Sequence, residues 1–243
     1  MKTLAFASRN AKEILRDPLN LAFGIGFPLV VLFLLTAIQS NIPVSLFELD
    51  RLTPGITVFG LSFISLFSGM LIARDRSTSF LMRLFASPLT ASNFITGYTL
   101  PLLPMALAQV AVCFLAAMAL GLSVNARILL SILVQLPAMV MFIAIGLLAG
   151  SLLTDKQVGG ICGALLTNLS AWLSGTWFDL DLVGGTFKAI ARALPFVHAV
   201  DAGRAALSGN YSSILPELTW VTAYAAVLLA LAIYFFSRKM KNE

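Results

Sequence analysis

Residues 54–73 read PGITVFGLSFISLFSGMLIA, a stretch of twenty residues without Asp, Glu, Lys, Arg or His. A helix of about twenty apolar residues crosses the ~30 Å hydrocarbon core of a bilayer. Five further stretches meet the same description, at 20–39, 98–122, 128–153, 158–178 and 218–237. The sequence therefore predicts an all-α polytopic membrane protein with six transmembrane helices.

The composition of the whole chain agrees with a membrane protein. Hydrophobic residues make up 59% of the 243 residues and charged residues 11%, whereas a soluble domain carries about 25% charged residues. The two cysteines, Cys113 and Cys162, lie inside apolar stretches, where each is expected to pack as a small hydrophobic residue. With one histidine, His198, the sequence predicts neither a metal site nor a disulfide framework.

The distribution of basic residues predicts the orientation of the spans. If both termini are cytoplasmic, the inside segments hold eleven of the sixteen Lys and Arg residues and the outside segments hold five. Such an excess of basic residues marks the cytoplasmic side. The net charge of +5 therefore follows from topology, and no nucleic-acid partner is needed to explain it. The first apolar stretch is longer than the core of a signal peptide, so we expect it to remain as span one.

Residues 1–19 predict an amphipathic helix ahead of the first span. Pro18 ends the segment. One arc at helical spacing is apolar and contains Leu4, Ala7, Ala11, Ile14 and Leu15. The opposite arc is charged and contains Arg9, Lys12, Glu13 and Arg16. Such a helix is expected to lie in the membrane interface with its basic side toward anionic head groups, and a solvated tail is the alternative.

The longest cytoplasmic loop covers residues 74–97. It begins Arg74-Asp75-Arg76, and a short helix with an apolar face and one basic residue is expected before Pro88. That face contains Phe80, Leu81, Leu84 and Phe85, and Arg83 lies among them. From the residues alone, docking on a partner protein and resting on the membrane are equally good interpretations.

The long outside segment, residues 179–217, predicts two short helices. Apolar residues recur at helical spacing up to Pro195, and a second helical stretch runs from 196 to 207. Both are too short to span, which favours a pair of re-entrant or interfacial helices. Asp201 and Arg204 are three residues apart and are expected to pair. For His198 near Asp201, a packing role is favoured over a pH-sensing gate.

Several motifs are missing from the sequence. It has no phosphate-binding loop of the Walker A type and no metalloprotease or serine-hydrolase motif, so no catalytic residue and no ATP site are assigned to this chain. Transporters driven by ions usually carry ionisable groups in their spans, and these spans have none. Two classes of function are left: transport that a separate motor drives, and a passive or structural role. Polar residues inside the spans, such as Asn168 and Trp172, favour helix packing over a substrate site.

The order of these features resembles the permease subunits of type-2 ABC exporters, also called type V ABC exporters. Residues 74–102, with Ser87-Pro88-Leu89-Thr90 and then Gly97, resemble the segment that couples such permeases to their ATPase. Residues 194–204, LPFVHAVDAGR, resemble the stretch outside span five. The sequence departs from the family where Ser77 stands for a usual Gly and Leu194 for a usual Asn.

The resemblance implies one transmembrane domain over residues 1–243, with the interfacial helix at 1–19, spans one to five over 20–178, outside half-helices at 179–217 and span six at 218–237. It implies a bacterial inner-membrane exporter of an amphipathic substrate such as a drug, peptide, lipid or glycolipid. The permease would pair with a second copy and with two ATP-binding-cassette subunits, which would bind the ATP and Mg. A membrane scaffold and a secondary transporter are the alternatives.

The resemblance also implies roles for particular residues. Those coupling to the ATPase would be Arg74, Asp75, Arg76, Phe80, Arg83, Leu84, Ser87, Pro88, Asp155, Lys156 and Gln157, beside the helix that carries Arg9, Lys12 and Arg16. An extracellular gate would contain Pro195, His198, Asp201 and Arg204. Spans one, two and five would line the substrate path with Phe27, Phe63, Phe67, Asn168 and Trp172.

Overall fold

The computed structural model describes residues 2–78 and 89–242, and every regular element in these ranges is a helix. The all-helical prediction is therefore confirmed. Five expected coupling residues lie outside the described ranges, namely Phe80, Arg83, Leu84, Ser87 and Pro88.

Five helices of the described chain are long and apolar enough to cross a membrane. They correspond to predicted spans one, two, three, four and six. The first is built from α2 (Pro18–Leu21), η1 (Ala22–Gly26) and α3 (Phe27–Gln39), and the fourth from α7 (Arg127–Val134) and α8 (Leu136–Leu152); the others are α4 (Leu49–Ser77), α6 (Ala91–Ala119) and α14 (Tyr211–Asn242). α4 and α6 begin several residues before the predicted spans, because the helices continue past the apolar core into polar residues.

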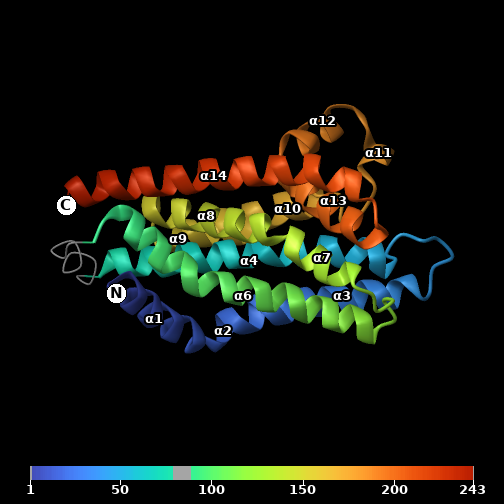
Figure 1. Cartoon of the computed structure of the whole chain (residues 1–243), viewed down its shortest axis with the longest axis horizontal. Coiled ribbons are helices and arrows are strands. Elements are labelled where there is room, and N and C mark those ends of the chain that lie inside the picture. The colour runs from blue at the N-terminus through green and yellow to red at the C-terminus, as the bar shows by residue number, and fades with distance from the viewer. Residues whose placement is uncertain (1, 79–88, 243) are drawn as a thin grey trace.

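The predicted fifth span, residues 158–178, is not among these five helices. The chain here forms α9 (Asp155–Val158), the π-helical segment η2 (Gly159–Leu166) and α10 (Thr167–Leu173). It leaves the helix before Gly175, which has a φ of +69°. Figure 1 shows this segment running along the long axis of the molecule beside α4 and α8. A sixth crossing stays a prediction.

Helix α4 lies at the centre of the bundle and packs against α3, α6, α8, α13 and η2 (Figure 1). Its contact with α8 depends on two glycines. A Cβ atom at Gly146 would lie 2.0 Å from the carbonyl oxygen of Ser65, and one at Gly150 would lie 2.2 Å from that of Gly69. The Gly146-x-x-x-Gly150 spacing therefore serves close packing inside the chain.

The bundle has two distinct ends (Figure 1). Both termini lie at one of them, which we call the terminal end. At the other, the distal end, lie α11 (Leu180–Val183), α12 (Gly185–Ala193) and α13 (Pro195–Ser208). α13 is largely buried against α4, α7 and α14. The two short helices expected near 187–194 and 196–207 are thus present, and their re-entrant placement stays a prediction.

Helix α1 (Lys2–Leu15) is oriented differently from the expectation. Phe6, which does not belong to the predicted apolar arc, is buried and packs edge-on against Phe94 and Tyr98 of α6. Leu4 and Leu15, which do belong to it, are 66% and 71% exposed. The sequence pattern missed this because one apolar arc is divided between two environments: part faces the protein and part faces outward.

Candidate functional site

One stripe of α4 reaches the surface in the middle of an otherwise buried helix. Between Leu61 and Leu71, only Phe63, Leu66 and Met70 are partly exposed. Spacings of three and four residues place them on one side of the helix. The π-helical segments η1 and η2 both contact α4, with Gly24 of η1 next to Phe67 and Gly163 of η2 next to Leu66, and such segments occur frequently at functional sites.

Aromatic side chains border this stripe on the side of α3. The ring of Phe27 lies 5.3 Å from that of Phe63, and Phe59 continues the contacts to Trp177 at 5.5 Å. These distances are typical of favourable aromatic pairs. Phe67, expected in the same path, is only 6% exposed because its ring packs against the backbone at Gly24. The structure thus brings Phe27 and Phe63 together and places Phe67 behind them.

The other border consists of η2 and α10. Asn168 is exposed, and its Nδ2 donates to the carbonyl of Ala164 at 2.8 Å. Trp172 is 54% exposed, and its ring lies 5.9 Å from that of Phe178. We define the open face as Phe27, Phe63, Leu66, Asn168 and Trp172. It is uncharged and aromatic, with a single amide, and suits an amphipathic molecule or a second apolar protein surface.

A compact set of polar contacts, the terminal network, joins α1, α4 and α6. Asp75 of α4 has a side chain only 4% exposed. Its two oxygens accept from Arg9 at 2.7 and 2.9 Å, and one also accepts from the Tyr98 hydroxyl at 2.8 Å. Asn10, fully buried, donates to the carbonyl of Gly97. Burial raises the pKa of Glu13, although Arg9 lies 2.7 Å away and opposes the rise.

These contacts correct two expectations about charged residues. The guanidinium of Arg9 was expected to face lipid head groups, but it binds the buried Asp75 while its own side chain stays partly exposed. Asp75 and Arg76 were expected to face a partner protein, yet Asp75 is buried and Arg76 donates to the carbonyls of Gly150 and Leu153 at the end of α8. The reason is that α4 continues as a helix to Ser77, which turns both side chains toward neighbouring helices.

Other expected coupling residues do lie on the surface of the terminal end. Arg74 is half exposed and lies 3.5 Å from Asp17. Asp155, Lys156 and Gln157 are exposed on α9, where Gln157 completes a capping box with Thr154. The contact of Arg76 with Leu153 brings the end of α4 next to this short helix. Lys12 on α1 and Arg16, directly after α1, are exposed.

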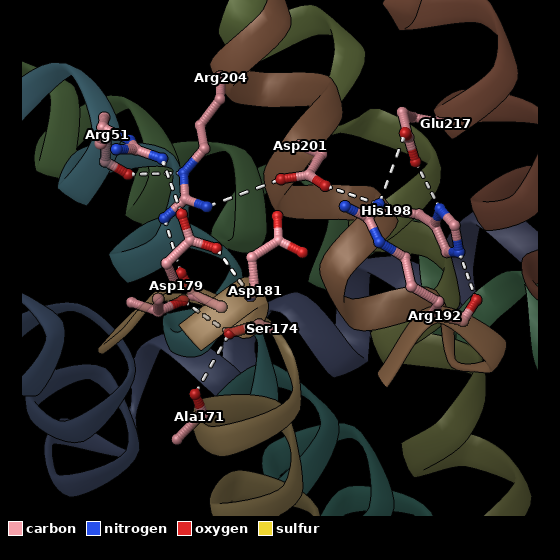
Figure 2. Close-up of polar contacts among 12 residues, drawn as sticks. Arg51, Ala171, Ser174, Asp179, Asp181, Arg192, His198, Asp201, Arg204 and Glu217 are labelled. Atoms are coloured by element: carbon pink, nitrogen blue, oxygen red, sulfur yellow. Dashed lines mark hydrogen bonds and ion pairs between the residues drawn. The ribbon is translucent and has the colours of Figure 1, made fainter. Parts of the chain in front are cut away.

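A second set of charges, the distal network, joins α12, α13 and α14 (Figure 2). Arg192 of α12 lies 2.9 Å from Asp201 of α13 and 3.8 Å from Glu217 of α14. The Nδ1 atom of His198 contacts Glu217, and its Nε2 lies 2.8 Å from the carbonyl of Arg192. The imidazole also stacks on Trp220, with the rings 5.1 Å apart and nearly parallel. Pro195 occupies the first turn of α13, where its fixed φ suits helix initiation.

Arg204 extends the distal network to the outer ends of α4 and α10 (Figure 2). Its Nε donates to the carbonyl of Arg51 at 3.0 Å and its Nη2 to that of Gly175 at 2.8 Å. Its Nη1 lies 3.6 Å from Asp201, so the expected pair is formed. Burial raises the pKa of Asp201 and lowers that of Arg204. Beside them lies a cavity of about 200 Å³ lined by both residues, Arg51 and Asp179.

Sequence reasoning missed several members of these networks. Tyr98 and Asn10 were absent from the predicted sites, and the local sequence gives no clear signal for either, since Asn10 lies between Arg9 and Ala11 and Tyr98 lies between Gly97 and Thr99. Glu217 was missed because it precedes the predicted start of span six by one residue. Arg192 was assigned to an outside segment without a partner. Among the described residues, no group of three or more His, Cys, Asp or Glu could hold a metal ion.

The bundle of long apolar helices with an uncharged open face defines a polytopic helical membrane protein. More particularly, the family model for the ABC-2 type transporter matches residues 1–208, so the chain belongs to that family. The match ends at the last residue of α13. The chain is therefore a permease component, and its family implies association with an ATP-binding-cassette component. A search of curated proteins finds no match.

Proposed function

We propose that the chain is the permease subunit of an ATP-driven exporter that moves an amphipathic substrate along the open face. The proposal includes six spans, with both termini in the cytoplasm of a bacterium and the segment from Asp155 to Leu173 as span five. The observation that carries it is the open face itself. An uncharged, aromatic surface on the central helix has no ionisable group for a driving ion, which favours energy that enters elsewhere.

A second copy of the permease would complete the substrate path. On one chain the open face leaves Trp172 more than half exposed, as is the neighbouring Leu165 of η2. Large exposed apolar surfaces mark interaction sites with protein or lipid. Two such faces turned toward each other would enclose a conduit of aromatic and apolar side chains between the two copies.

The terminal end is where the ATPase subunits would dock. Arg74, Asp155 and Lys156 are exposed there, and the segment with Arg83 and Leu84 joins α4 to α6. Arg76 and Asp75 would act indirectly, because they fix the end of α4 to α8 and to α1. A movement of the docked ATPase subunits would therefore be transmitted to α4, the helix that carries Phe63 and Leu66. ATP and Mg would bind to the partner and not to this chain.

Helix α1 would lie in the membrane interface. It presents three faces: Phe6 and Asn10 toward the protein, Leu4 and Leu15 outward, and Lys12 on the remaining side, with Arg16 directly after the helix. Exposed leucines beside exposed basic residues suit a helix at the boundary between acyl chains and anionic head groups.

The distal network would close the path on the extracellular side. Arg204 joins the outer ends of α4 and α10, the two helices that border the open face. An outward-open state would require these helix ends to separate, and hence the two hydrogen bonds of Arg204 to break.

The experiment is co-purification of the chain with its ATP-binding-cassette subunit, followed by flux and ATPase assays in vesicles. Replacing Phe63→Ala or Asn168→Leu should lower substrate-stimulated ATPase and flux, whereas Val227→Ala, on the exposed side of α14, should leave both unchanged. Recovery of no such subunit would overturn the proposal. ATPase without flux would support a scaffold, and flux that follows a proton or sodium gradient and ignores vanadate would support a secondary transporter.

A further inference from the structure

The cavity beside Arg204 is enclosed by parts of the chain that lie far apart in the sequence. Its volume is about 200 Å³, and its walls come from the segments before α4 and after α10 and from α4, α11, α12 and α13. Figure 2 shows its charged side chains converging from these elements. The cavity is therefore a product of the fold and does not belong to a single loop.

Charges of both signs line the cavity in equal number. They belong to three arginines and three aspartates, namely Arg51, Arg192, Arg204, Asp179, Asp181 and Asp201. Each aspartate forms an ion pair with a basic side chain, so positive and negative groups alternate along the wall. An anion would lie next to aspartates and a cation next to arginines, and contact between like charges opposes binding. A ligand with a single net charge is therefore disfavoured.

Two of these ion pairs are too wide to be hydrogen bonds. Nη2 of Arg51 lies 3.7 Å from Oδ2 of Asp179, and Nη1 of Arg204 lies 3.6 Å from Oδ1 of Asp201. In both places a donor and an acceptor face the same space without bonding to each other. A group that accepts from the arginine and donates to the aspartate would satisfy both, and a hydroxyl group does this.

We propose that the cavity is a binding site for a neutral, hydroxyl-rich group such as a sugar ring. Each hydroxyl of a sugar is both a donor and an acceptor, which matches a wall where arginines and aspartates alternate. A zwitterion would need its two charges to meet separate positive and negative regions, and the alternation provides none. Leu46, Phe178 and Leu180 supply apolar parts of the wall, against which the C–H groups of a sugar ring can pack. Ligand sites usually combine such apolar walls with a few polar groups that fix orientation.

The cavity also lies next to the open face. Phe178 lines the cavity, and its ring lies 5.9 Å from that of Trp172 on the open face. A sugar in the cavity can therefore be the head group of an amphipathic molecule whose apolar part lies on Trp172. This second step rests on the proposed function, whereas the binding site itself lies within one chain and does not depend on transport.

The test places one reactive thiol at the cavity. Ser45 lines the cavity and is exposed, whereas the native Cys113 and Cys162 are fully buried. The full-length Ser45→Cys variant in nanodiscs is labelled with an uncharged maleimide in the presence of methyl β-glucoside, dimethyl phosphate or tetramethylammonium. We expect methyl β-glucoside to slow the labelling about threefold at twice its dissociation constant, and we expect no effect of the two ions.

Two control variants separate the site from general effects of the sugar. Val124→Cys places the thiol in the exposed loop between α6 and α7, away from the cavity, and its labelling rate should not change with methyl β-glucoside. Adding Arg51→Gln to Ser45→Cys should raise the sugar concentration needed for protection about tenfold, because a charged donor is lost. This change keeps the carbonyl group of Arg51 to which Arg204 donates.

The length of the alkyl chain on the sugar identifies the source of the ligand. If the sugar is the head group of the substrate, octyl β-glucoside below its micelle concentration should protect at about tenfold lower concentration than methyl β-glucoside. Trp172→Ala should then remove this advantage and leave the protection by methyl β-glucoside unchanged. Equal protection by the two glucosides would support a site for free sugars and contradict the link to the substrate path.

Absence of protection by methyl β-glucoside would overturn the proposal, as would equal protection by either ion. If Ser45→Cys does not fold, thermal unfolding decides instead, because a ligand that binds the folded state stabilises it. Methyl β-glucoside should then raise the unfolding midpoint of the wild type more than that of Arg51→Gln, and equal shifts would contradict the site. None of these measurements uses flux or ATPase activity, so the binding site and the proposed transport function can fail separately.

Discussion

At the terminal end, the single buried carboxylate of Asp75 accepts hydrogen bonds from two other helices. At the distal end, positive and negative side chains alternate, and each carboxylate contacts two positive or polar partners. The Asp75 side chain is 4% exposed, and those of Asp201 and Glu217 are 25% and 20% exposed. Carboxylates and arginines therefore form two different kinds of contact between helices. The terminal network fixes α1, α4 and α6 as one unit, and the distal network consists of contacts that can break one at a time.

The comparison suggests how motion could pass through the molecule. When an ion pair with a buried member loses one partner, it leaves an uncompensated buried charge. Helices held together by such a pair therefore resist separation. Contacts to carbonyl oxygens and to partly exposed carboxylates can be exchanged for water at lower cost. We therefore expect the terminal end to move as a block and the distal end to open. The following predictions test this difference, from the largest effect to the smallest.

The largest effect is expected at Arg9. Arg9→Met leaves Asp75 buried with Tyr98 as a hydrogen-bond donor but without its counter-charge, and it should lower the free energy of unfolding by about 3 kcal/mol. The value is at the low end of the range for buried pairs because Arg9 itself is 37% exposed. Unfolding in mixed micelles measures it. Arg16→Met, at an exposed position directly after the same helix, is the control, and equal losses would contradict the rigid contact.

A smaller effect is expected at the distal end. Arg204→Gln removes charged hydrogen bonds to two carbonyl groups and should cost about 2 kcal/mol. The loss should be local, so hydrogen exchange should accelerate around Gly175 and Arg51 and not around Asp75. Arg127→Gln, which removes one exposed contact, serves for comparison. Faster exchange over the whole bundle would show that the distal end is not separable.

The hydroxyl of Tyr98 provides a test within the terminal network. Tyr98→Phe removes one hydrogen bond to an ionised carboxylate and should cost about 1.5 kcal/mol. Since Tyr98 and Arg9 bind the same group, their effects should not add. A double-mutant cycle measures this coupling, and simple additivity would show that the two contacts are independent.

The smallest effect concerns pH. Burial raises the pKa of Asp201, whereas the hydrogen bond and charge of Lys188 lower the pKa of exposed Asp181. As the pH falls from 7 toward 4, the folded protein binds the Asp201 proton before the unfolded chain does, so the wild type should gain stability relative to Asp201→Asn. For Asp181 the unfolded chain binds first, so the wild type should lose stability relative to Asp181→Asn. The difference in unfolding free energy between the wild type and each variant is plotted against pH. If both differences change in the same direction, the opposite pKa shifts of Asp201 and Asp181 are contradicted.

The sequence predicted the helical class and five of the spans because length and the absence of charge decide them. It could not predict how α1 is oriented, since Phe6 and Leu4 are both apolar and only the packing partners distinguish a protein face from a lipid face. It assigned Asp75 to a docking surface because charges after an apolar stretch usually face water. The contact of Asp75 with Arg9, 66 residues away, is invisible to local pattern. The proposed sixth crossing shows the same limit, since η2 and α10 are short and η2 is rich in glycine.

The π-helical segments beside α4 make the molecule sensitive to the insertion or deletion of single residues. In an α-helix each residue advances the next by about 100°, so one residue inserted or deleted rotates everything beyond it by that angle. Deleting one residue between Gly159 and Leu166 would restore α-helical winding and turn Asn168 and Trp172 away from Phe63 together. At this place the number of residues, more than their identity, determines which side chains meet the open face, and relatives that differ by a single insertion would present another surface without any substitution there.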